Sequence, residues 1–210
     1  MKKILLSSFI AITTLVFSLT ACAQARFIEG EHYKVISQTA SAKPNVKEFF
    51  SFWCPHCFNF EPLVAQMKNK LDANVTFEKV HVNFMGFAGR ELQDEVTRGM
   101  LIGRVLKNEQ ALNTAIFNYI HRQRATIAST DDVRSIFLVN GVSAEEFDKT
   151  AKSFAVKNML RKNNKTIDEF RRFVSGVPNF IVNDKYQATF TRDMTPDDMV
   201  DLIVYLSEMK

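Results

Sequence analysis

The hydrophobic and polar positions of the chain follow two periods, which predict strands before residue 85 and after residue 175 with helices between them. Residues 46–53 (VKEFFSFW) are rich in β-branched and aromatic side chains on both faces, which is typical of a central strand covered on both sides. Residues 54–71 are apolar at a helical period, with a kink expected at Pro62, and residues 75–82 form another strand. Strand, helix and strand at this spacing predict a βαβ unit with parallel strands.

The helical period then continues from residue 86 to about residue 175. Ser143 and Glu146 have the spacing of a capping box, and Gly141 just before them suits the end of the preceding helix. Thr130 is expected to begin another helix of this block. About 90 residues of helix are therefore predicted between two groups of strands.

Strands flank this helical block on both sides. A first strand is expected at residues 32–36, and residues 179–182 and 185–190 read as a hairpin closed by an Asn-Asp turn. Thr195 as cap and Pro196 at the first helical position predict a final helix to about residue 209. The fold class is therefore α/β, a mixed sheet with an inserted all-helical domain. The expected boundaries are a leader at 1–23, sheet domain segments at 24–85 and 176–210, and the insertion at 86–175.

The first residues have the pattern of an export signal. Two lysines precede the apolar run of residues 4–19, which is shorter and richer in Ser and Thr than a membrane span. Small residues allow cleavage after Ala23, which we favour, or after Ala25. An alternative is a lipoprotein box that ends at Cys22, which would then carry the lipid. Each alternative places the mature chain outside the cytoplasm, where disulfides persist.

Composition narrows the class of protein further. The 210 residues include 19 Phe and 3 Cys and carry a formal net charge of +4, with no basic run longer than two residues. These values exclude a disordered chain and a disulfide-stapled miniprotein, and they give no reason to expect a nucleic-acid partner. Most of the Phe side chains are expected to fill the core, and some to line an apolar groove beside the reactive cysteine.

The segment Cys54-Pro55-His56-Cys57 carries the chemistry, because it sets two cysteines three positions apart where a helix is predicted to begin. Unpaired backbone N–H groups and the helix dipole at that end stabilise a thiolate at Cys54, and His56 adds a cation or a hydrogen-bond donor. A stabilised thiolate leaves readily, so the disulfide form oxidises other thiols. Cys57, one turn into the helix, is expected to be less exposed and to resolve the mixed disulfide.

Other interpretations of this segment fit less well. Zinc sites need about four ligands, and the remaining histidines, His32, His81 and His121, show no ligand spacing, so we expect them to be ordinary strand or helix residues. A structural disulfide across two residues closes too short a loop to stabilise the chain much, and a buried inert pair does not suit the Pro and His between the cysteines. No metal, flavin or nucleotide cofactor is expected.

Four segments together resemble the DsbA family of periplasmic thiol:disulfide oxidoreductases: 48–57 (EFFSFWCPHC), 79–86 (KVHVNFMG), 176–180 (GVPNF) and 183–186 (NDKY). The resemblance extends over residues 29–210. It implies a thioredoxin fold with a helical insertion, and a monomer that donates its disulfide to unfolded exported proteins with free cysteines. It also implies reoxidation by DsbB, a quinone reductase of the inner membrane.

The resemblance assigns roles to further residues. Pro178 matches the cis-proline that lies against the active-site disulfide, and the backbone of Val177 would then pair with substrate. Glu48 shares a strand face with apolar residues, where a charge is costly unless paired, and it matches a buried acid whose partner is Lys79. The pair would tune the thiol and relay protons near the second cysteine, or would be a structural ion pair. Glu61 matches another acid of the family, or is a solvated surface charge.

Trp53 departs from the family pattern, in which Phe or Tyr more often precedes the first cysteine. Thioredoxin has Trp at that place. The resemblance therefore defines the fold better than it defines how strongly oxidising the protein is. Two other functions remain open from the sequence: a disulfide reductase or isomerase, and a periplasmic peptide-binding chaperone in which the disulfide is incidental.

Overall fold

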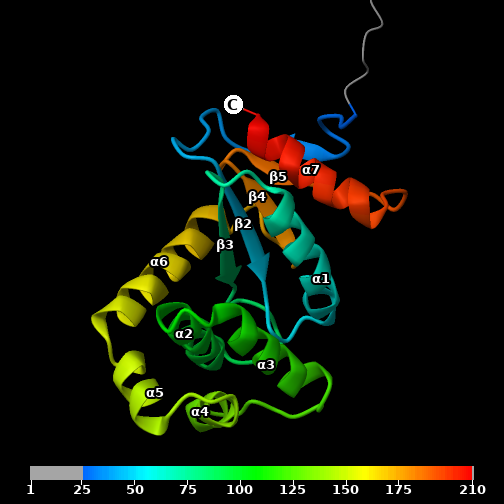
Figure 1. Cartoon of the computed structure of the whole chain (residues 1–210). Helices are drawn as coiled ribbons and strands as arrows, with labels where there is room; N and C mark the ends of the chain where they lie inside the picture. Colours follow the sequence, from blue (N-terminus) through cyan, green and yellow to red (C-terminus); the bar gives the residue numbers. More distant parts are fainter. Residues whose placement is uncertain (1–25, 210) are drawn as a thin grey trace, which may run out of the picture.

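A computed structural model describes residues 26–209, so the expected leader, its cleavage sites and Cys22 lie outside the described residues. A five-stranded sheet forms the centre of the molecule (Figure 1), in the order β1-β5-β4-β2-β3. The strands are β1 (Tyr33–Val35), β2 (Asn45–Phe50), β3 (Thr76–His81), β4 (Asn179–Val182) and β5 (Tyr186–Ala188). β2 pairs in parallel with β3 and antiparallel with β4, which confirms the βαβ unit and the mixed sheet.

β2 is shorter than the strand predicted at residues 46–53. Its pairing with β3 ends at Phe50 opposite His81, and the N–H of Cys54 then donates to the carbonyl of Ser51 at 3.0 Å, which closes a turn. Phe52 in this turn is fully buried. The apolar residues extend beyond the end of β2 because the turn that follows the strand is also buried.

Helices cover both faces of the sheet (Figure 1). α1 (Pro55–Lys70) and α7 (Pro196–Glu208) pack on one face, and α6 (Phe154–Phe170) packs on the other. α7 begins as predicted, with the Thr195 hydroxyl accepting from the N–H of Asp198. Pro62 lies inside α1, which continues through it as one helix.

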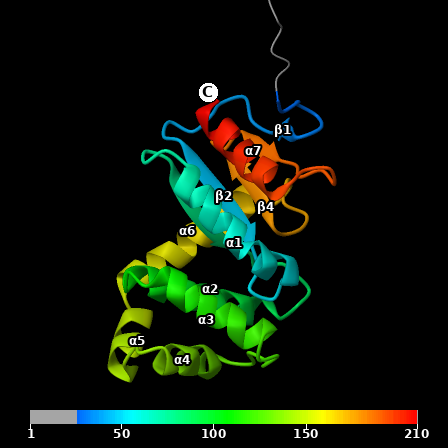
Figure 2. The same ribbon diagram turned by 45° about the vertical axis from the view of Figure 1, so that its right-hand side comes forward.

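Between β3 and β4 the chain forms five helices, of which four lie at one end of the sheet and α6 returns along its face (Figure 2). The remaining four are α2 (Arg90–Val105), α3 (Glu109–His121), α4 (Thr130–Val139) and α5 (Ala144–Ala151). Ser143 accepts from the N–H of Glu146 as expected, and Gly141 has φ +90°. α4 begins at Thr130 as expected, and its N-cap is Ser129, whose N–H donates to the carboxylate of Asp132. The boundaries at 86 and 175 stay a prediction.

The turn after β2 joins the sheet to the inserted helices. One apolar cluster contains Phe52, Cys54 and Cys57 together with side chains of α2 and α3. The ring of Phe52 lies 4.8 Å from that of Phe117 on α3. The two cysteines therefore lie where the two parts of the fold meet. Among residues 26–209, no helix combines the length and apolar content that a membrane span requires.

Candidate active site

Cys54 is the N-cap residue of α1, with extended backbone angles of φ −84° and ψ 114°. Its Sγ accepts a hydrogen bond from the backbone N–H of Cys57 at 3.3 Å, as a capping side chain does. The hydrogen bond from the Cys57 thiol, followed by the backbone N–H groups of Cys57 and His56, lowers the pKa of Cys54 to about 6 despite its burial. Cys54 is therefore about nine-tenths thiolate at pH 7.

Cys57 differs from Cys54 in both access and acidity. Cys54 is 4% exposed and Cys57 is fully buried, so an attacking thiol reaches the sulfur of Cys54. The hydrogen bond that the Cys57 thiol donates to Cys54, together with burial, raises the pKa of Cys57 above the usual thiol range. Cys54 is therefore stable as a thiolate, whereas Cys57 is stable as a thiol.

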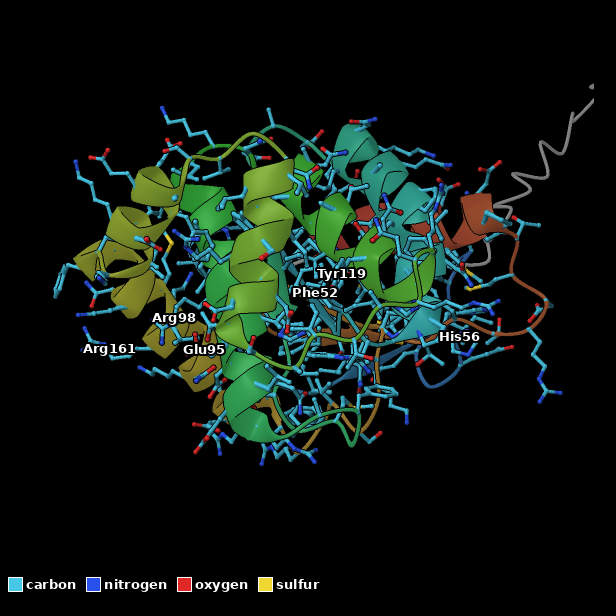
Figure 3. The ribbon with its side chains drawn as sticks, turned by 90° about the horizontal axis from the view of Figure 1, so that it is seen from below. Phe52, His56, Glu95, Arg98, Tyr119 and Arg161 are labelled. Carbon is cyan, nitrogen blue, oxygen red and sulfur yellow. The ribbon has the colours of Figure 1, made fainter. Side chains whose placement is uncertain are left out.

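The two residues between the cysteines are exposed on the first turn of α1. Pro55 occupies the first helical position, where its missing N–H is not needed. The exposed His56 side chain lowers the pKa of Cys54 less than the Cys57 thiol and the two backbone N–H groups do. Figure 3 shows His56 toward the edge of the molecule and Phe52 near its middle.

The loop before β4 lies against Cys54. The peptide bond between Val177 and Pro178 is cis, as the resemblance implied. The carbonyl oxygen of Val177 lies 3.5 Å from the Sγ of Cys54, within hydrogen-bonding reach of the thiol. Two segments more than a hundred residues apart in the sequence thus meet at one sulfur.

Glu48, Lys79 and Glu61 form one ion-paired group, and the charge of Glu48 acts on Cys57. The Nζ of Lys79 lies 2.7 Å from Glu48 and 2.6 Å from Glu61. Burial raises the pKa of Glu48 above its usual range, against the opposing charge of Lys79. Burial disfavours the charged form of Lys79, but the two carboxylates outweigh it and raise its pKa. Glu61 is therefore part of an ion-paired group and is not simply a solvated surface charge.

Two histidines that sequence reasoning treated as ordinary lie next to the site. His121 at the end of α3 donates from Nε2 to the carbonyl of Phe52 at 2.8 Å, and its ring stacks on Phe58 with centroids 5.0 Å apart. His81 is fully buried, with Nδ1 at 2.7 Å from the hydroxyl of Thr97. No local pattern indicated these contacts, because each joins the sheet domain to the inserted helices.

The arrangement suits thiol–disulfide exchange. Cys54 and Cys57 are free thiols three positions apart, of which Cys54 is acidic and 4% exposed and Cys57 is fully buried. Within the described part of the chain, no group of three or more His, Cys, Asp or Glu side chains has the geometry to hold a metal ion. The reactive groups that the site offers are the two sulfurs.

Comparisons with known proteins agree with this chemistry. The family model of the DSBA-like thioredoxin domain matches residues 45–203. The thiol:disulfide interchange protein DsbA of Haemophilus influenzae is 36% identical over 203 residues, which cover 95% of this chain and 94% of that protein. The disulfide oxidoreductase DsbA of Proteus mirabilis superposes with a TM-score of 0.76 at 28% identity, over 86% of this chain and 97% of that structure.

A second Proteus mirabilis DsbA structure holds a non-covalently bound peptide, PWATCDS, and superposes with a TM-score of 0.74 at 27% identity. It covers 87% of this chain and 97% of that one. These matches confirm the thioredoxin fold and a thiol:disulfide oxidoreductase activity. The chain belongs to the family of DSBA-like thioredoxin domains and is a protein thiol:disulfide oxidoreductase.

Proposed function

We propose that the protein is a periplasmic dithiol oxidase that donates the Cys54–Cys57 disulfide to reduced cysteines of newly exported proteins. The observation that carries the proposal is the difference between the two sulfurs. Cys54 caps α1 with a pKa of about 6, whereas Cys57 is buried with a raised pKa. At pH 7 a shift of this size stabilises the reduced protein by about 1.4 kcal/mol, or about 30 mV, and so favours accepting electrons from substrate.

The first step is attack of a substrate thiolate on the Sγ of Cys54. A substrate–Cys54 disulfide forms, the Cys54–Cys57 bond breaks, and the electron pair leaves on the sulfur of Cys57. Because the pKa of Cys57 is raised, this sulfur takes up a proton. In the reduced protein the backbone N–H of Cys57 donates to the Sγ of Cys54. This hydrogen bond stabilises Cys54 and does not stabilise the departing sulfur of Cys57.

The second step oxidises the substrate. A second substrate thiol loses its proton to solvent and attacks the substrate sulfur of the mixed disulfide. The substrate disulfide forms, and Cys54 leaves as the thiolate that the end of α1 stabilises. Over both steps the substrate loses two electrons, the cysteine pair gains them, and one proton is released at neutral pH.

Glu48, Lys79 and Glu61 supply the proton that Cys57 requires. The charge of Glu48 acts on the Cys57 thiol, and burial raises the pKa of Glu48, which favours the protonated carboxyl that can donate to Cys57. Lys79 holds the carboxylate that remains after transfer. The charge of Glu48 also raises the pKa of Cys57 and in this way tunes the cysteine pair.

Val177 and Pro178 form the substrate-facing side of the site. The backbone of Val177 lies against Cys54, where an extended substrate strand adds to it. The peptide complex of the Proteus mirabilis relative supports a binding surface for cysteine-containing peptides in the family.

The export signal pattern of residues 1–23 supports a periplasmic location for the mature chain. The family resemblance supports a monomer. Reoxidation by a DsbB-like quinone reductase of the inner membrane follows from the family resemblance. Such a partner takes the two electrons that each substrate delivers, so one protein molecule turns over many times.

The test is oxidation of a reduced, unfolded substrate with two cysteines by the disulfide form of the protein. We expect the wild type to form the substrate disulfide and Cys54→Ser to be inactive. Ala111→Ser, at an exposed position of α3, is the matched control and should equal the wild type. Full activity of Cys54→Ser would refute the oxidase mechanism and favour a chaperone with an incidental disulfide.

A further inference from the structure

Three segments meet at Cys54, and none of them contains Asp or Glu. The hydrogen bond from His121 to the Phe52 carbonyl and the approach of the Val177 carbonyl to Cys54 bring them together. The segments are residues 52–60, residues 121–127 at the end of α3 and in the loop after it, and residues 173–180 around the cis-proline. The only Lys or Arg side chains in them are two arginines at the end of α3.

The first of these arginines, Arg122, lies against the beginning of α1. Its guanidinium carbon is 5.9 Å from the centroid of the Phe58 ring, and Phe58 follows Cys57 directly. The N–H of Phe58 donates to the carbonyl of Cys54 at 3.1 Å, so this ring lies one helical turn from the reactive cysteine. The contact with Phe58 places an exposed cation beside the active site.

Neither Arg122 nor Arg124 has a carboxylate partner among the described residues, although both are exposed. Other arginines of the helical insertion differ in this respect. Arg98, Arg104 and Arg134 each form an ion pair with an acid of the same insertion. The two arginines at the end of α3 therefore keep their charge unpaired.

The first acids beyond the three segments are engaged by other groups. Glu61 is held by Lys79 at 2.6 Å. At the start of α4, Asp131 acts on Arg134, and Asp132 accepts from the backbone N–H at the cap of the helix. The positive charge beside Cys54 is therefore available to an anion from outside the molecule.

The backbone at Arg124 gives a second reason to expect a role for this side chain. Its φ is +56°, in the left-handed region that favours glycine at the end of a helix. A cation at the C-terminal end of a helix stabilises the helix dipole, which is a sufficient account of Arg122 alone. It does not explain why an arginine occupies the position two residues later.

We propose that Arg122 and Arg124 form a subsite that binds acidic side chains flanking the reactive cysteine of a substrate. This inference deepens the proposed dithiol oxidase function and rests on it. An extended substrate bound at Cys54 and Val177 advances about 3.3 Å per residue. Side chains a few positions from its cysteine therefore come within reach of the end of α3.

The chemistry of the subsite is recognition of a carboxylate. A guanidinium binds a carboxylate through two parallel N–H donors, and an exposed pair of this kind changes an affinity by up to about fivefold. Neither arginine is among the groups that lower the pKa of Cys54. The subsite therefore acts on the charge of the substrate and leaves the acidity of the thiol unchanged.

Anionic lipid head groups also bind exposed arginines. The position of Arg122 favours the substrate as the occupant, because a membrane bound beside Phe58 would cover Cys54 and exclude the thiol that must attack it. The partner is therefore an acidic segment of an exported protein.

The test measures how fast the disulfide form of the protein oxidises two reduced peptides of equal length. Both contain the same pair of cysteines, flanked by Glu in the acidic peptide and by Gln in the neutral peptide. Trp53 is the single Trp and precedes Cys54, so its fluorescence follows each reaction in stopped flow. The quantity compared between proteins is the ratio of the acidic to the neutral rate constant, in which the reactivity of the peptide thiols cancels.

The variants separate charge from position. Arg122→Gln/Arg124→Gln removes both charges, and Arg122→Lys/Arg124→Lys keeps them. Arg161→Gln, at an exposed position of α6, is the matched control. Figure 3 shows Arg161 at the side of the molecule away from His56.

We expect the rate ratio to fall about fivefold in the double Gln variant, to stay within about twofold of the wild type in the double Lys variant, and to be unchanged in Arg161→Gln. The difference between the wild type and the double Gln variant should shrink at about 0.5 M salt, since salt screens exposed charges. The pKa of Cys54 should remain about 6 in every variant.

A wild-type rate ratio in the double Gln variant would overturn the inference, and so would a shifted pKa of Cys54 that accounts for the slower reaction. Loss of binding to phosphatidylglycerol vesicles in this variant, with an unchanged rate ratio, would assign the arginines to a lipid surface instead. These outcomes are distinct from failure of the oxidase function, in which the wild type would oxidise neither peptide.

Discussion

His121 donates a 2.8 Å hydrogen bond from Nε2 to the carbonyl of Phe52, although the two residues lie 69 positions apart in the chain. The acceptor belongs to the buried turn that leads from β2 into Cys54. The donor is the last residue of α3, in the helical insertion. The insertion therefore holds the turn that sets the reactive cysteine at the end of α1.

This contact predicts a stability difference between two substitutions. His121→Phe keeps the stack on Phe58 but leaves the Phe52 carbonyl without its donor, so the free energy of unfolding should fall by about 1 kcal/mol. His121→Gln retains a donor and should lose less. Urea unfolding of both variants measures the difference, and equal stability of the Phe and Gln variants would contradict the assigned role.

The acidity of Cys54 depends more on Cys57 than on His56. Thiolate absorbance near 240 nm should titrate with a pKa of about 6 in the reduced protein. Cys57→Ala removes the largest contribution and should raise that pKa more than His56→Ser does. The lowered pKa stabilises the reduced form only above about pH 6, and that stabilisation is lost as pH falls through this value. The reverse order of the two variants would exclude the hydrogen bond as the main cause.

The buried pair of Glu48 and Lys79 predicts strong coupling. Lys79→Met leaves the Glu48 carboxyl without its cation and should lower the free energy of unfolding by about 3 kcal/mol. Adding Glu48→Gln to that variant should restore much of the loss, because no buried charge then lacks a partner. A double-mutant cycle by urea unfolding measures the coupling energy. If the two effects simply add, the pair is not coupled.

The buried imidazole of His81 should make the protein less stable in acid. Burial, followed by the charge of Lys79, lowers the pKa of His81 from 6.5 to about 3. The unfolded chain therefore binds more protons between these pH values, and the free energy of unfolding falls as pH decreases, by up to about 1.4 kcal/mol per pH unit. The aromatic ring of His81→Phe should pack beside Phe52 and remove this dependence.

The control for this prediction is His32→Asn in the sheet domain, which should keep the wild-type dependence. Urea unfolding at pH 4 and pH 7 gives the difference for each protein. If His81→Phe loses as much stability between these pH values as the wild type, the acid sensitivity arises elsewhere.

Local signals in the sequence predicted most elements, and contacts between distant segments account for what they missed. The cap at Thr195, the hairpin turn and the Cys54 helix start each depend on neighbouring residues, and the structure confirms them. The predicted end of β2 was wrong because a run of apolar residues does not distinguish a strand from a buried turn. The contact of His121 was missed because it depends on how α3 packs against the sheet domain.

The central claim is that Cys54 and Cys57 form an oxidising pair, and equilibration with glutathione buffers tests it most directly. The fraction of disulfide, followed by Trp53 fluorescence, gives the midpoint potential. We predict a midpoint at least about 30 mV more oxidising than that of a reducing thioredoxin, because the Cys54 thiolate stabilises the reduced form. A midpoint near about −270 mV, the value of a reducing thioredoxin, would contradict the account.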